Sequence, residues 1–141
     1  MLIAFVSIVT MFNYLLSFAG TSLESILGSI FKPLAWSMGI PWNEAGSMGI
    51  LMGKKIVFTE LIAFGDLKFL IEKEAISNRT AIIASYALCG FANFGSIGIQ
   101  LGGIGGMAPS RKKDLATLVT KAMIGGALAS WLTASIAGIL I

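Results

Sequence analysis

The chain has 141 residues, of which 56 % are hydrophobic and 12 % are charged, and it contains no histidine. A soluble domain carries about 25 % charged residues, so the composition argues against a soluble enzyme or a disordered tail and favours an integral membrane protein. With Cys89 as the single cysteine, no internal disulfide and no Cys/His zinc site is expected. The net charge of +3 is too small and too scattered to predict nucleic-acid binding.

The first predicted element is a transmembrane helix over residues 1–20, an uncharged stretch of the length that crosses a bilayer. Asn13 is its strongly polar side chain and is expected to face protein, not lipid. Residues 21–38 have apolar side chains at helical spacing, with Glu24 among the polar positions between them. This pattern predicts an amphipathic helix in the membrane interface, which the Gly39-Ile40-Pro41 step should end.

Residues 42–72 have the pattern of a hairpin. Two apolar arms, at 45–52 and 56–65, flank the polar sequence Gly53-Lys54-Lys55, and neither arm is long enough to span a bilayer. Two short arms around a polar tip predict a re-entrant helical hairpin, whose backbone at membrane depth must be satisfied by protein or by a water-filled cavity. The charges that begin at Asp66 mark the return to water.

Residues 79–109 form a glycine-rich stretch that is uncharged from Thr80 to Ser110 and longer than one span needs. Asn93 lies near its middle, between two phenylalanines. A span interrupted by Asn and Gly is typical of a broken helix, whose unwound backbone binds substrates and ions in secondary transporters.

A final transmembrane helix is predicted over residues 112–141. The basic loop at 111–113, Arg-Lys-Lys, precedes it and should be cytoplasmic by the positive-inside rule. The C-terminus would then lie on the outer face of the membrane.

Glu60 is the strongest single indication of function. A carboxylate at membrane depth costs about 2.5–3.5 kcal/mol even on the mildest scale, so it is retained where something offsets that cost. The functional interpretation is a hydrogen-bond acceptor for a polar substrate, or a proton carrier. The structural alternative is an ion pair with Lys54 or Lys55 across the hairpin tip.

Asn93 and Ser96 are three residues apart and share one face if the backbone is helical there. Together they offer donors and acceptors to a ligand, although hydrogen bonds between helices are an equally good interpretation. Phe91 could present its ring to a flat substrate, or it could pack against lipid or protein. No nucleophile, base or metal-ligand cluster accompanies these residues, so an enzyme is not predicted.

The run SYALCGFANFGSIGIQLGG over residues 85–103 resembles the signature of the concentrative nucleoside transporters. Weaker similarities flank it at residues 32–42, at residues 53–61 and at Ala108-Pro109 with its basic cluster. The resemblance covers essentially the whole chain. One departure is Thr59-Glu60-Leu61, which stands where the family usually has Asn-Glu-Phe.

The resemblance implies an all-α integral membrane fold and the C-terminal portion of a symporter that couples nucleoside uptake to Na⁺ or H⁺. It implies an elevator mechanism, a homotrimer, and, for a bacterial source, the inner membrane. Residues 1–40 would hold a scaffold helix and the interfacial helix, and residues 41–141 would belong to the transport domain.

The family's ribose contacts carry over to Glu60, Asn93 and Ser96, and its aromatic residue near the base carries over to Phe91. Nothing in this chain corresponds to the family's first hairpin, which supplies most of the coupling-cation site. The missing N-terminal half is therefore an expected partner, and no cofactor is expected. The alternative is a small structural or accessory membrane protein without a substrate.

Overall fold

The computed structural model describes the backbone of residues 2–141 and the side chains from Ser7 onward. Within this range the chain is helical and has no strand, so the all-helical class is confirmed. In chain order the elements are α1 (Leu2–Ser17), α2 (Leu23–Ser37), α3 (Trp42–Val57), α4 (Glu60–Glu72), α5 (Asn78–Leu88), α6 (Phe94–Met107), the short 3-10 helix η1 (Pro109–Arg111) and α7 (Lys112–Leu140).

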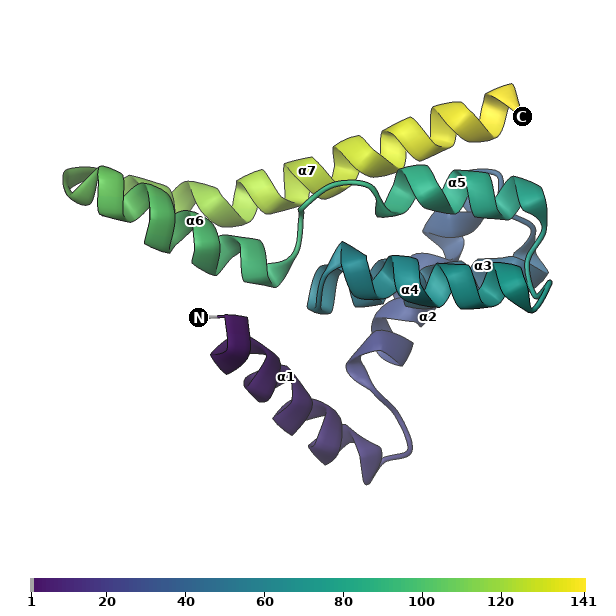
Figure 1. Ribbon diagram of the computed structural model, residues 1–141, viewed down its shortest axis with the longest axis horizontal. Helices are drawn as coiled ribbons and strands as arrows, with labels where there is room; N and C mark the ends of the chain where they lie inside the picture. The colour runs from purple at the N-terminus through teal and green to yellow at the C-terminus, as the bar shows by residue number, and fades with distance from the viewer. Residues whose placement is uncertain (1) are drawn as a thin grey trace.

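Helix α7 runs along the length of the molecule and organises the other elements (Figure 1). Helix α5 packs along the C-terminal half of α7, and α6 packs along its N-terminal half. Helices α3 and α4 form an antiparallel pair beside α5, and α2 packs against α3. Helix α1 projects away from this body (Figure 1).

Glycines allow α2 and α3 to approach each other closely. A Cβ atom built on Gly49 would lie 2.3 Å from the carbonyl oxygen of Gly28, and one on Gly53 would lie 3.1 Å from the carbonyl oxygen of Glu24. Larger side chains at these positions would push the two backbones apart. The main core continues from this crossing through α4 and α5 to Ala134 of α7.

The buried face of α2 is formed chiefly by small residues, and large apolar side chains of its amphipathic pattern stay exposed. The described buried residues of α2 are Glu24, Gly28 and Ala35, whereas Ile26 and Ile30 are exposed. The reason is the glycine-mediated crossing, which requires small residues against α3. Glu24 is tolerated there because it accepts a hydrogen bond of 2.7 Å from Nδ2 of Asn13, and Asn13 thus faces protein as predicted.

The tip of the α3–α4 pair also differs from the prediction. Gly53, Lys54 and Lys55 lie inside α3, and the chain reverses at Phe58-Thr59, between the end of α3 and the start of α4. The glycine is used for packing against α2, and the two lysines occupy the last turn of α3. Cationic side chains are favourable at a helix C-terminus, where the helix dipole is negative.

Three helix ends meet around Arg79, in the first turn of α5. Its guanidinium donates hydrogen bonds to the carbonyl oxygens of Gly138, Gly39 and Ile141, with a distance of 2.6 Å to that of Gly138. Gly39 has a φ of +94°, which only glycine adopts readily, and it forms the bend between α2 and α3. Arg79 therefore joins the end of α2 to the end of α7.

Within the part of the chain that the structure describes, the helical stretch Pro109–Leu140 is long and apolar enough to cross a membrane. Helix α1 has 16 residues, and Met1 of the predicted first span lies outside the described residues. The predicted broken-helix region contains two helices, α5 and α6, with residues 89–93 between them.

Candidate functional site

Glu60 and Asn93 come together although 33 residues separate them in the sequence. Glu60 is the first residue of α4, directly after the Phe58-Thr59 turn, and Asn93 is the residue before α6. Asn93 Nδ2 donates to Oε2 of Glu60 over 3.3 Å. The contact thus joins the tip of the α3–α4 pair to the interruption between α5 and α6.

Asn93 and Ser96 form the N-terminal cap of α6. Oδ1 of Asn93 accepts from the backbone N–H of Ser96 at 2.8 Å, and the Ser96 hydroxyl lies 3.4 Å from the backbone nitrogen of Asn93. The hydroxyl also donates to the Asn93 carbonyl oxygen at 2.6 Å. Both residues are buried, at 0 % and 1 % exposure. Because Asn93 is the N-cap residue and is not helical, the two side chains do not share the helical face that the sequence suggested but form a reciprocal capping box.

This cap leaves the Asn93 amide NH₂ free to point toward the α3–α4 tip. The Oδ1 atom is occupied by the cap, whereas Nδ2 contacts Glu60. The carboxylate of Glu60 lies at the start of its own helix and also beside the start of α6. Its negative charge therefore lies near two helix N-termini, and each N-terminus is the positive end of a helix dipole.

Lys55 is the residue of the site that sequence reasoning missed. Its side chain is 0 % exposed, and its ammonium donates to the carbonyl oxygens of Ala87 and Cys89 at 2.9 and 3.4 Å and to the Ser130 hydroxyl at 2.8 Å. These carbonyls lie at the C-terminal end of α5. The lysine was predicted as part of a polar tip or as a partner of Glu60, because the sequence does not show the end of α5 beside it.

The α3–α4 tip therefore contacts the interruption at both of its ends. Lys55, five residues before Glu60, holds the carbonyl end of α5, and Glu60 contacts the cap of α6. A cation at a helix C-terminus and an anion near a helix N-terminus both complement the helix dipoles. Gly90, between these two ends, has a φ of +117°, so the chain turns there in a conformation that favours glycine.

Phe91 lies in the same interruption, with its side chain 53 % exposed. The neighbouring Cys89 is also exposed. An exposed aromatic ring two residues before a buried amide offers an apolar surface beside a polar group. The structure thus places all four predicted site residues in one region: Glu60 at the tip, and Phe91, Asn93 and Ser96 in or beside the interruption.

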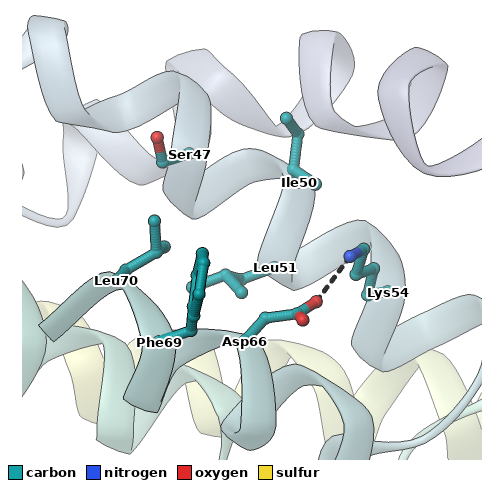
Figure 2. A pocket seen from close by; sticks show the side chains of 7 residues that line it. All are labelled: Ser47, Ile50, Leu51, Lys54, Asp66, Phe69 and Leu70. Carbon is teal, nitrogen blue, oxygen red and sulfur yellow. Dashed lines mark hydrogen bonds and ion pairs between the residues drawn. The ribbon is translucent and has the colours of Figure 1, made fainter. Parts of the chain in front are cut away.

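The ion pair proposed as the structural alternative for Glu60 is not formed within the described side chains. Lys54 pairs with Asp66 at 2.5 Å instead, and Lys55 bonds to the oxygens of α5 and α7. Figure 2 shows the Lys54–Asp66 pair at one end of a groove of about 280 Å³ between α3 and α4. Among residues 7–141, no three His, Cys, Asp or Glu side chains are grouped so that they could hold a metal ion.

An apolar helical chain whose buried polar groups converge on a helix interruption has the features of a helical membrane transporter. Comparison with known proteins gives the family. Residues 1–138 match the family model described as the Na⁺ dependent nucleoside transporter C-terminus. The chain belongs to the concentrative nucleoside transporter family, to whose C-terminal part it corresponds, and the relatives are transporters, not enzymes.

Individual relatives agree with this assignment. The chain is 46 % identical to the uncharacterized transporter YutK of Bacillus subtilis, covering 100 % of the chain and 36 % of YutK. It is 40 % identical to human solute carrier family 28 member 3, covering 99 % of the chain and 23 % of that protein.

A solved structure of CNTnw in an inward-facing substrate-bound state matches with a TM-score of 0.85 and 44 % identity. The match covers 97 % of this chain and 34 % of that one. The chain thus spans between about a quarter and about a third of the length of these relatives.

Proposed function

We propose that this chain is the C-terminal portion of a cation-coupled nucleoside symporter and supplies one wall of its substrate site. Nucleosides carry ribose hydroxyls, which donate hydrogen bonds, and a flat base, which stacks on aromatic rings. The Glu60–Asn93 contact is the observation that carries the proposal. It brings a strong acceptor and an amide together at a helix interruption, where transporters bind their substrates.

In this proposal Glu60 accepts hydrogen bonds from the ribose hydroxyls. The Asn93 amide, which donates to Glu60 in the structure, turns its NH₂ donors to the ribose when substrate enters. Phe91 contacts the base through its exposed ring. Ser96 fixes Asn93 through the cap, and a direct contact with substrate would require its hydroxyl to leave that cap.

Hydrogen bonds to a carboxylate are stronger in a dehydrated pocket than in water. The site therefore needs a second wall that excludes water, and the part of the relatives that this chain does not span would supply it. That part would also hold most of the Na⁺ or H⁺ site. The family resemblance further supports a homotrimer in the plasma membrane. The positive-inside rule supports a cytoplasmic loop at residues 111–113 and a C-terminus on the outer face.

We also propose that residues 42–72 form the re-entrant hairpin and that α5 and α6 are the two halves of a broken membrane helix. The relative CNTnw has been solved in inward-facing, intermediate and outward-facing states, which supports an alternating-access movement of elevator type. In the proposed division at residue 40, the scaffold holds residues 1–40 and the moving part holds 41–141. Because α2 and α3 would then lie in different parts, such a movement would either break the close α2–α3 crossing or move α2 together with α3.

The test is Glu60→Gln in the full-length transporter that contains this chain, with radiolabelled uridine uptake and binding as readouts. A hydrogen bond to a charged group contributes about 1.5–3 kcal/mol, so affinity should fall by about 10- to 100-fold. Glu72→Gln is the matched control, because Glu72 is an exposed carboxylate at the other end of α4. Equal uridine affinity in the Glu60 variant and the wild type would refute the site.

The accessory-protein alternative makes the opposite prediction for Glu60→Leu. In a protein without a substrate, the Glu60 carboxylate would only lower the free energy of unfolding. The leucine variant should then unfold at a higher temperature and keep its activity in the cell. A transporter should instead lose uptake in that variant. For the 141-residue chain expressed alone, we expect no uridine uptake, since one wall of the site cannot enclose a substrate.

A further inference from the structure

Lys55 is a buried cation whose charge is balanced in an unusual way. Its side chain is 0 % exposed, and of the carboxylates in the part of the chain that the structure describes, none lies within 4.0 Å of its ammonium. A buried charge is normally paired with an opposite charge. Here neutral oxygens make the direct contacts with the ammonium, and the Glu60 carboxylate acts on it electrostatically from beyond 4.0 Å.

The oxygens around Lys55 satisfy all three of its donors. A lysine ammonium has three N–H groups and no acceptor, and it meets the carbonyl oxygens of Ala87 and Cys89 and the hydroxyl of Ser130. The hydroxyl donates its own proton to the carbonyl oxygen of Ala127 at 2.9 Å and so presents a lone pair to the ammonium. The three acceptors come from α5, from the interruption and from α7.

Such a set of oxygens resembles a cation site. In transporters with broken helices, unwound backbone carbonyls and half-helix C-terminal ends coordinate the coupling ion. The carbonyls of Ala87 and Cys89 stand at the end of α5 in that manner, and the Lys55 ammonium occupies the position between them. The positive charge is therefore covalently attached to the α3–α4 pair and cannot dissociate.

We propose that Lys55 is a fixed internal cation at this interruption and a positioning residue for the substrate site. By holding the carbonyls at the end of α5, the ammonium fixes the position and direction in which the backbone leaves α5 and continues into residues 89–93. Asn93 follows four residues after Cys89, so its amide depends on that placement. Docking of the α3–α4 tip then sets both Glu60 and Asn93 at once.

The role of Lys55 in substrate binding rests on the proposed function, whereas the contacts of its ammonium with the three oxygens do not.

The experiment uses the full-length transporter with three variants. Lys55→Met keeps an unbranched side chain one atom shorter and removes the charge. Lys55→Ala removes the arm beyond Cβ and leaves a space with the shape of propylammonium. Lys54→Met is the matched control, because the neighbouring lysine faces the Asp66 groove (Figure 2).

Two properties are measured for each variant. The first is uridine affinity, in the absence of additive, with n-propylammonium and with n-propanol at the same concentration. The second is the hydrogen-exchange rate of the backbone amides at residues 86–93, followed by peptide mass spectrometry. Exchange reports on the loosening of the α5 end and does not require a substrate.

Loss of the ammonium leaves buried carbonyls without a donor, so we expect both Lys55 variants to lose about tenfold or more in uridine affinity. Propylammonium should restore the alanine variant and not the methionine variant, and propanol should restore neither. Backbone exchange at residues 86–93 should be faster in both Lys55 variants and unchanged in Lys54→Met.

Several outcomes would overturn the proposal. Wild-type affinity and wild-type backbone exchange in both Lys55 variants would show that the cation positions nothing. Equal rescue by propanol would show that Lys55 only fills space. If Lys55→Met fails to fold, the propylammonium and propanol comparison in Lys55→Ala decides. If the wild type binds no nucleoside, the proposed function fails, and the effect of propylammonium on backbone exchange at residues 86–93 still tests whether a cation holds the end of α5.

Discussion

Asn93 combines two tasks that substitution can separate. Its Oδ1 atom caps α6 through the Ser96 N–H at 2.8 Å, and its Nδ2 atom reaches Glu60 at 3.3 Å. Alanine removes both contacts. Serine is a good N-cap residue and keeps an oxygen near the Ser96 N–H, but its side chain is too short to reach Glu60.

The two contributions have different sizes and different readouts. Loss of an N-cap side chain costs about 0.5–2 kcal/mol of stability, and the 0 % exposure of Asn93 places its loss toward the upper part of that range. We therefore expect Asn93→Ala to lower the free energy of unfolding by about 1–2 kcal/mol. Asn93→Ser should remain within about 0.5 kcal/mol of the wild type, as cap-conserving changes do.

Substrate binding should respond to both variants. The amide donors are absent in each, so uridine affinity should fall by about tenfold or more in Asn93→Ser as well as in Asn93→Ala. The assays are thermal unfolding of the purified full-length transporter and uridine titration. An Asn93→Ser variant with wild-type affinity would refute the reasoning, because it would show that the cap alone explains this residue.

Two further predictions concern packing and helix ends. Gly49→Ala should destabilise the protein by about 1–3 kcal/mol, as overpacked contacts do, because its Cβ would lie 2.3 Å from the Gly28 carbonyl oxygen. Gly46→Ala in the same helix, with nothing within 4 Å of its Cβ, should be neutral or stabilising in the same thermal unfolding assay, and equal effects would contradict the close crossing. Arg79→Met should lower stability by about 1–3 kcal/mol through unsatisfied carbonyls and speed amide exchange at the end of α7, whereas unchanged exchange there would show that the guanidinium holds nothing.

The sequence by itself determined the class of protein and the residues worth testing. The low content of charged residues predicted a membrane protein, because so few charged side chains cannot give a folded chain a surface polar enough to be soluble in water. Glu60 stood out because a carboxylate within an apolar stretch is costly to retain. The interruption near Asn93 was visible because an asparagine lies among several glycines in an otherwise apolar run.

Only the tertiary structure decided how these residues meet. Successive residues of a helix are about 100° apart around its axis, so Lys54 and Lys55 point in different directions, one toward Asp66 and the other toward the end of α5. The sequence shows two adjacent lysines and does not show what lies beside each. Likewise, the pairing of Glu60 with Asn93 depends on how the α3–α4 pair packs against α5 and α6. That packing comes from contacts between segments far apart in the chain.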